Sequence, residues 1–332
     1  MLRSFNAILA AAFLAAALRA ESYRMYASLN TSRGYVAGAK LLPSGLFQLQ
    51  SGGEWRQLGF NHPLVVALDY DPRDPRILYL AAGNGCIRSA DGGNTWRIMT
   101  GWEMTELKDV SVDRLQPDHI YVALPDGIGV SRDQGRTWSH ADEGIRRKFT
   151  QAVRVDRTRA GRVFAGTEQG IFRSEDGGRR WQPAIATEKT VLQIEQSPGD
   201  PNTWMAATER GGAFLSRDGG VVWKPVPGVP LGSVLSNISF DPANRNRIAI
   251  AAWGPGVLVS EDAGRTWLAR NERLPKGEVW RVAFDPGHPG RLYAAVHEER
   301  LYVSDDGGRI WRGSGLEGSV VYGISFVPEG KP

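Results

Sequence analysis

Three carboxylates in this chain could supply the acid and base chemistry of a hydrolase. Asp69, Asp109 and Glu195 lie in separate short segments in which apolar and polar residues alternate. Two carboxyl groups held about 5–9.5 Å apart can cleave a glycosidic bond, one as the acid and the other as the nucleophile or base. Arg154 and Arg281 follow the same alternation. The alternative is therefore a set of three acids and two arginines that form ion pairs without catalysis.

Other kinds of reactive site find less support. The five histidines are scattered, with no paired spacing typical of metal ligands. The single cysteine, Cys86, is expected to be a small buried side chain rather than a nucleophile. The net charge of +4, from 40 Lys and Arg against 36 Asp and Glu, is too small to indicate a nucleic-acid partner. We therefore expect neither a metal, nor a cofactor, nor nucleic acid.

The elements that must position these residues form a repeated unit. Six segments share the pattern Ser-x-Asp-x-Gly-x-x-Trp, with tryptophans 42–44 residues apart, and a worn seventh copy ends at Trp55. The aspartates of the six segments are Asp91, Asp133, Asp176, Asp218, Asp262 and Asp306. Alternating residues and Gly/Asp turns in each unit indicate four short strands. Such units predict an all-β propeller of seven four-stranded antiparallel blades.

The end of the chain predicts how the ring closes. Residues 322–326 resemble the first strand of the other units. The N-terminal copy offers strands at 35–39, 46–49 and 54–58, but no clear first strand. We expect the C-terminal strand to complete this N-terminal blade, because closure removes the exposed edges of an open array.

Residues 1–20 are expected to be a secretory signal peptide. Arg3 precedes an apolar run over 7–18, and Ala20 provides a small residue at the cleavage site. Cleavage after Ala17 and an uncleaved anchor are the alternatives, although the run is shorter than the roughly 20 residues that span a bilayer. The mature chain, 21–332, is then a single seven-bladed domain without a transmembrane span. We expect it to be a periplasmic or extracellular monomer.

The Ser-x-Asp segments resemble the Asp-box, or BNR, repeat over nearly the whole mature chain. Secreted sialidases, xyloglucanase-type glycoside hydrolases, sortilin-type receptors and photosystem II assembly-factor propellers carry this repeat, and the last group is the most similar in length. The resemblance implies that these turns lie on the outer rim, away from any active site. We therefore interpret the six aspartates as structural.

The remaining candidate residues fall on loops opposite those turns or on the innermost strands. Trp102, Trp253 and Trp280 could contact a protein or stack on a sugar, or could pack between blades. The consecutive Arg146, Arg147 and Lys148 could bind an acidic segment, or could be solvated surface. The other candidate binding residues are Arg154, Arg281, His297 and Arg300.

Two functions follow from these residues. The first is an exported, non-catalytic scaffold that recognises a protein or a polysaccharide, as the resemblance to assembly factors implies. The alternative is a sialidase-like or xyloglucanase-like glycoside hydrolase that uses Asp69, Asp109 and Glu195. The chain lacks the Arg-Ile-Pro motif and the arginine triad of sialidases. Xyloglucanase-type enzymes usually join two propellers, and this chain has room for one.

Overall fold

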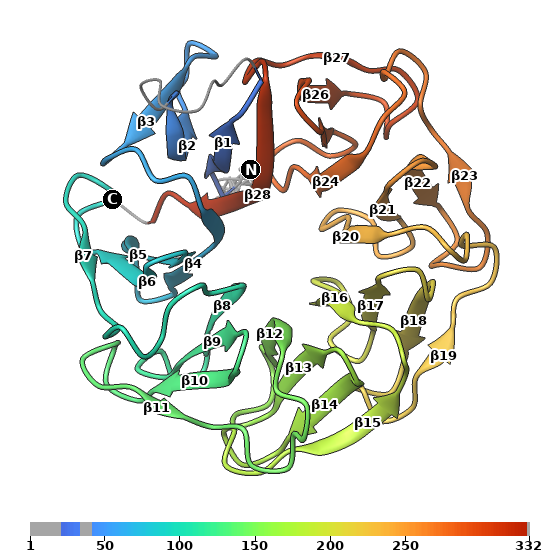
Figure 1. The fold of residues 1–332 in the computed structure, drawn as a ribbon. Helices are drawn as coiled ribbons and strands as arrows, with labels where there is room; N and C mark the ends of the chain where they lie inside the picture. Colours follow the sequence, from blue (N-terminus) through green and yellow to red (C-terminus); the bar gives the residue numbers. More distant parts are fainter. Residues whose placement is uncertain (1–20, 34–41, 331–332) are drawn as a thin grey trace, which may run out of the picture.

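Seven antiparallel sheets of four strands are arranged in a ring around a central axis (Figure 1). The computed structural model describes residues 21–33 and 42–330, and within them there is no α-helix. No helix in those ranges could therefore cross a membrane. The predicted seven-bladed, all-β propeller is confirmed, whereas the predicted signal peptide lies outside the described residues.

The strands of each blade follow one another from the channel outward, the innermost strand first. Blade 1 contains β28 (Ser319–Pro328), β1 (Tyr23–Thr31), β2 (Ser44–Leu49) and β3 (Trp55–Leu58). Blade 2 contains β4 (Val65–Asp71), β5 (Asp74–Ala82), β6 (Gly85–Ser89) and β7 (Arg97–Ile98). Blade 3 contains β8 (Asp109–Val112), β9 (Ile120–Leu124), β10 (Gly127–Ser131) and β11 (Ser139–His140). Blade 4 contains β12 (Thr150–Val155), β13 (Val163–Thr167), β14 (Gly170–Ser174) and β15 (Gln182–Ala186).

The last three blades follow the same order. Blade 5 contains β16 (Val191–Gln196), β17 (Trp204–Thr208), β18 (Ala213–Ser216) and β19 (Lys224–Pro225). Blade 6 contains β20 (Leu235–Phe240), β21 (Ile248–Ala252), β22 (Gly256–Ser260) and β23 (Leu268–Ala269). Blade 7 contains β24 (Val279–Phe284), β25 (Leu292–Val296), β26 (Arg300–Ser304) and β27 (Arg312–Gly313).

Alternation of strand direction gives the ring two distinct faces. The turns from first to second strand and from third to fourth strand share one face, which we call the turn face. The turns from second to third strand and the connections between blades share the other face, which we call the loop face. The six Ser-x-Asp segments join third and fourth strands and therefore lie on the turn face.

The ring closes through the two ends of the chain. β28 pairs antiparallel with β1, from Tyr23 opposite Pro328 to Thr31 opposite Ser319. This pairing confirms the predicted closure. The second strand of blade 1 is β1, however, so its expected position at 35–39 is wrong, and those residues lie outside the described ranges. All residues from Met25 to Leu29 are buried, because β1 lies inside blade 1 between β28 and β2.

Local hydrogen bonds shape each Ser-x-Asp turn. In blade 3 the Ser131 hydroxyl donates to Asp133 Oδ1 at 2.8 Å and accepts from the Gly135 N–H at 2.8 Å. The Thr137 hydroxyl and N–H both donate to Asp133, at 2.6 and 2.8 Å. These hydrogen bonds, those from Thr137 above all, lower the pKa of Asp133 to about 2. Gly135 adopts a φ of 84°, a conformation that favours glycine.

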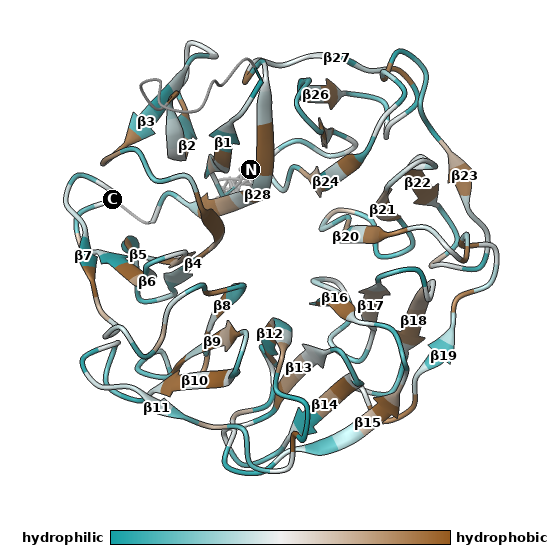
Figure 2. Cartoon of the chain, viewed as in Figure 1, coloured by the Kyte–Doolittle hydropathy of each residue, from teal (hydrophilic) through white to brown (hydrophobic). Residues whose placement is uncertain are grey.

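The core lies between the blades. Seven buried hydrophobic clusters each combine strands from two neighbouring blades, and Figure 2 shows hydrophobic residues concentrated on the strands. Trp181 also donates its indole N–H to the Ala141 carbonyl of the preceding blade at 2.7 Å. Packing and hydrogen bonding thus hold adjacent blades together.

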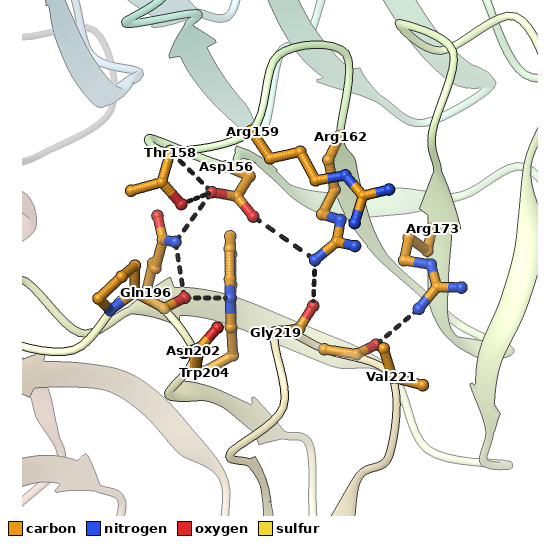
Figure 3. A network of polar contacts seen from close by, with 12 residues as sticks. Asp156, Thr158, Arg159, Arg162, Arg173, Gln196, Asn202, Trp204, Gly219 and Val221 are labelled. Atoms are coloured by element: carbon orange, nitrogen blue, oxygen red, sulfur yellow. Dashed lines mark hydrogen bonds and ion pairs between the residues drawn. The ribbon is translucent and has the colours of Figure 1, made fainter.

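A polar network joins blades 4 and 5 near the turn face (Figure 3). Arg162 Nη1 donates to the Gly219 carbonyl at 2.7 Å and lies 3.8 Å from Asp156 Oδ2. Gln196 Nε2 donates to Asp156 Oδ1 at 3.0 Å and to the Pro201 carbonyl at 2.9 Å. This network fixes Gln196 at the end of its innermost strand, beside the channel.

Candidate functional site

The innermost strands line the channel with polar side chains. Two cavities occupy it, of about 330 Å³ toward the turn face and about 180 Å³ toward the loop face. Polar residues at alternating positions of β4, β8, β12, β16, β20 and β24 line one or both of them: Asp69, Asp109, Arg154, Gln193, Glu195, Asn237 and Arg281. The channel is therefore polar, as the alternation predicts.

Several of these side chains connect one blade to the next. Asp69 Oδ2 accepts from the Val112 N–H at 2.8 Å, and Asp109 Oδ2 accepts from the Val153 N–H at 3.1 Å. An innermost strand has no neighbouring strand on its channel side, so its N–H groups need other acceptors. The channel carboxylates supply such acceptors to the following blade.

Amides and hydroxyls play the same part in other blades. Asn237 Oδ1 accepts from the Val282 N–H at 2.5 Å, and Ser239 Oγ accepts from the Phe284 N–H at 3.0 Å. Gln193 Oε1 accepts from the N–H of the residue after Asn237 at 2.5 Å. These positions thus act in the assembly of the ring, whether they carry a charge or not.

Arg154 brings two of the three candidate catalytic carboxylates together. Its Nη2 lies 3.6 Å from Asp109 Oδ2 and 3.1 Å from Glu195 Oε1. Contact with one shared nitrogen brings these two oxygens close together, as the paired carboxylates of a glycosidase must be. The guanidinium, however, lies between them where a sugar would have to bind. Burial raises the pKa of Asp109 to about 6, against the opposing effect of Arg154.

Asp69 lies apart from this pair and has its own partners. It forms an ion pair with Arg114 and accepts the N–H of Tyr70 at 2.8 Å. With the inter-blade bond from the Val112 N–H, both of its oxygens have partners. The structure therefore does not assemble all three candidate carboxylates into one site.

The channel holds more positive charge than the alternation pattern suggested. Lys108, Arg114 and Arg157 line it in addition to Arg154 and Arg281. They were missed because they lie just outside the innermost strands, where the period-2 pattern stops. Five basic residues therefore face three acids, which corrects the expected excess of acid.

Three aromatic candidates on the loop face meet at blades 6 and 7. The rings of Trp253 and Trp280 stack at 5.4 Å with an interplanar angle of 24°, and His297 lies 5.1 Å from Trp280. Tyr322 meets Trp280 edge-on at 5.9 Å. These rings contact one another, which favours the packing interpretation over a free sugar platform.

Trp102 differs from these tryptophans. Its side chain is 89% exposed, in the connection from blade 2 to blade 3. Arg146 and Arg147 are exposed in the next connection, from blade 3 to blade 4, and no carboxylate of the described residues forms an ion pair with either. Lys148 lies 3.1 Å from Asp142 Oδ1, so its charge is balanced.

The last two charged candidates are also engaged. Arg300 lies 3.5 Å from Glu317, at the rim. Arg281 donates to the carbonyls of Ser236, Trp280 and Tyr322. Burial lowers the pKa of Arg281 to about 10. Arg281 thus holds three innermost strands together at the loop-face end of the channel.

Comparisons with known proteins identify the fold. No family model matches the chain, and no curated protein matches its sequence. The GH74 xyloglucanase from Xanthomonas campestris superposes with a TM-score of 0.65 at 19% identity, over 78% of this chain and 46% of that one. YCF48 from Cyanidioschyzon merolae gives 0.63 at 20% identity, over 80% and 89%, and YCF48 bound to D1 peptide gives 0.58 at 20%, over 75% and 81%.

These similarities concern architecture alone. The chain spans less than half of the Xanthomonas xyloglucanase, and its identity to each of these structures is 20% or lower. The chain is therefore a seven-bladed propeller whose structural neighbours include both a polysaccharide-degrading enzyme and a peptide-bound protein.

Proposed function

We propose that this chain is an exported, non-catalytic propeller that binds an acidic segment of a partner protein through its loop face. The observation that carries the proposal is Trp102, exposed over 89% of its surface in an inter-blade connection. Tryptophan and arginine are the residue types most enriched at the energetic centres of protein interfaces. The exposed Arg146 and Arg147, in the next connection, supply positive charge without a carboxylate partner in the described part of the chain.

Three further observations support this proposal. The structural neighbour YCF48 is known in a complex with D1 peptide, so a ring of this shape can present a peptide-binding surface. In this chain, Asp69 and Asp109 accept backbone N–H groups, which gives them a structural role. The signal peptide expected at residues 1–20, where a charged head precedes an apolar run, supports export.

Affinity capture of partner proteins by the exported chain tests the proposal. A partner should be retained by the wild type at low salt, with less retained as salt rises. Trp102→Ala and the double variant Arg146→Gln/Arg147→Gln should each release it. Arg136→Gln is the matched control, because Arg136 is also exposed but lies on the turn face. Equal capture by all variants, or no partner under any salt condition, contradicts the proposal.

Glycoside hydrolysis is the second candidate, favoured by the shared contact of Asp109 and Glu195 with Arg154. A screen on aryl glycosides and xyloglucan, with Asp109→Asn and Glu195→Gln as controls, decides between the two functions. We expect no turnover by the wild type. Turnover that both substitutions abolish would establish the hydrolase instead.

A further inference from the structure

The chain departs from its own repeat at one position of the turn face. The seven innermost strands can be aligned on the last position that packs between blades, which is Tyr70 in blade 2. Two residues after this position, five blades carry a proline: Pro72, Pro198, Pro242, Pro286 and Pro328. Blades 3 and 4 carry Arg114 and Arg157 there instead. Because these blades are adjacent in the ring, both arginines reach the same side of the channel mouth and line its larger cavity.

We propose that this end of the channel binds a small organic oxyanion, a carboxylate or phosphate attached to an apolar group, between Arg114 and Arg157. The site is distinct from the loop-face surface of Trp102, Arg146 and Arg147, and lies at the opposite end of the channel. Arginine suits it because its planar guanidinium can donate two parallel hydrogen bonds to a carboxylate or a phosphate.

Neighbouring side chains orient both guanidinium groups. Arg114 forms an ion pair with Asp69, and its guanidinium carbon lies 4.1 Å from the centre of the Tyr70 ring. Arg157 donates from Nε to Gln196 Oε1 at 3.2 Å and from Nη2 to the Gln196 carbonyl at 2.7 Å. The network of Figure 3 in turn holds Gln196. Both guanidinium groups are therefore held in place at the lining of one cavity.

The charge of Arg157 lacks a counterion. No carboxylate of the described residues lies within ion-pair distance of it, and its Nη1 has no hydrogen-bond partner among them. Enclosure in the channel lowers the pKa of Arg157, and the like charges of Arg154 and Arg114 lower it further, against Glu195. The residue is nevertheless exposed to solvent, and it lines the cavity. A bound anion would balance this charge.

The rest of the cavity is suited to an apolar group. Its volume of about 330 Å³ is in the range of small-molecule sites. Pro198, Pro242, Pro286 and Phe326, from blades 5, 6, 7 and 1, are exposed or half-buried and contribute apolar surface to its wall. The nearby Glu195 is already engaged by Arg154 and by Gln193. The cavity thus combines a cationic side with an apolar side.

Isothermal titration of the full chain with phenyl phosphate, benzoate, inorganic phosphate and neutral benzyl alcohol tests the proposal. Phenyl phosphate or benzoate should bind more tightly than inorganic phosphate, and benzyl alcohol should not bind. Comparison of the first two probes separates a phosphate ligand from a carboxylate ligand. Arg157→Gln and Arg114→Gln should each weaken binding about tenfold or more, the loss expected for one charge-assisted hydrogen bond.

Two variants keep the result interpretable. Arg157→Pro places at this position the residue that five other blades carry and removes, besides the guanidinium, only the N–H that donates to Gln196 Oε1 at 3.0 Å. It should therefore fold and still lose binding. Arg136→Gln, on the same face but outside the cavity, should bind like the wild type. The proposal is overturned if the wild type binds neither phenyl phosphate nor benzoate. It is also overturned if the folded Arg157 and Arg114 variants bind with unchanged affinity. Either result leaves protein binding by the loop face untouched.

Discussion

Two serines at the same register of different blades allow a sharp test of how the ring is held together. Ser239 in β20 and Ser325 in β28 both occupy the middle of an Ile-Ser-Phe segment that lines the channel. Ser239 Oγ accepts the Phe284 N–H at 3.0 Å. Ser325 makes no side-chain hydrogen bond with the described residues. Substitution by alanine removes a hydroxyl at either position. Only Ser239→Ala also removes a hydrogen bond between blades.

The expected difference follows from burial. Phe284 is only 3% exposed, so Ser239→Ala leaves its N–H without an acceptor in a poorly hydrated place. An unsatisfied buried donor costs about 1–3 kcal/mol. We expect Ser239→Ala to lower the free energy of unfolding by about 1–2 kcal/mol, and Ser325→Ala to change it by less than about 0.5 kcal/mol.

Urea denaturation, followed by tryptophan fluorescence and by circular dichroism, measures both values. Asn237→Ala extends the test, because it removes the acceptor of the Val282 N–H from the same strand. Equal stability of Ser239→Ala and Ser325→Ala would refute the reasoning. It would show that channel water replaces the hydroxyl, and that side chains on the innermost strands do not connect the blades.

Three other predictions concern the turns, the core and the closure. The pKa of Asp133 is lowered to about 2, so its hydrogen bonds stabilise the fold fully above about pH 4 and are lost toward pH 2. The melting temperature should therefore fall less steeply over this range in Asp133→Ala than in the wild type. An equally steep fall in both proteins would contradict this prediction. Burial raises the pKa of Cys86 to about 12, so mass spectrometry should find no iodoacetamide adduct at pH 8 until urea is added, and rapid labelling of the native protein would contradict its burial. Truncation after Gly318 removes β28 and its pairing with β1. Circular dichroism of the truncated chain should therefore show no cooperative unfolding, and a native-like transition would contradict closure through this strand.

The sequence predicted most of the fold because its signals are local. Each Ser-x-Asp turn makes its hydrogen bonds within a few residues, as Ser131, Asp133 and Thr137 show. The repeat of these turns predicted the number of blades, and residues 322–326 predicted the closing strand. The second strand of blade 1 was misplaced because β1 belongs to the copy that lacks a Ser-x-Asp turn, so no motif marked its register.

The candidate site was predicted less completely. Alternation correctly brought Asp109, Arg154 and Glu195 to the channel, because period 2 defines the side of a strand. It did not reach Arg114 and Arg157, which follow the strands and still line the channel. The replacement of proline by arginine in two adjacent copies was the available signal, and it is visible once all seven units are aligned.

Neighbours along the chain specify the repeating unit, its turns and the apolar residues that pack between blades, so these features could be read from the sequence. The balance of charges in the channel depends instead on the folded ring. Arg154 contacts acids 45 residues before it and 41 after it, and the Trp253, Trp280 and His297 rings meet from three separate segments. These contacts require neighbouring blades to lie side by side around one axis, where the charge of the channel is the sum over their innermost strands.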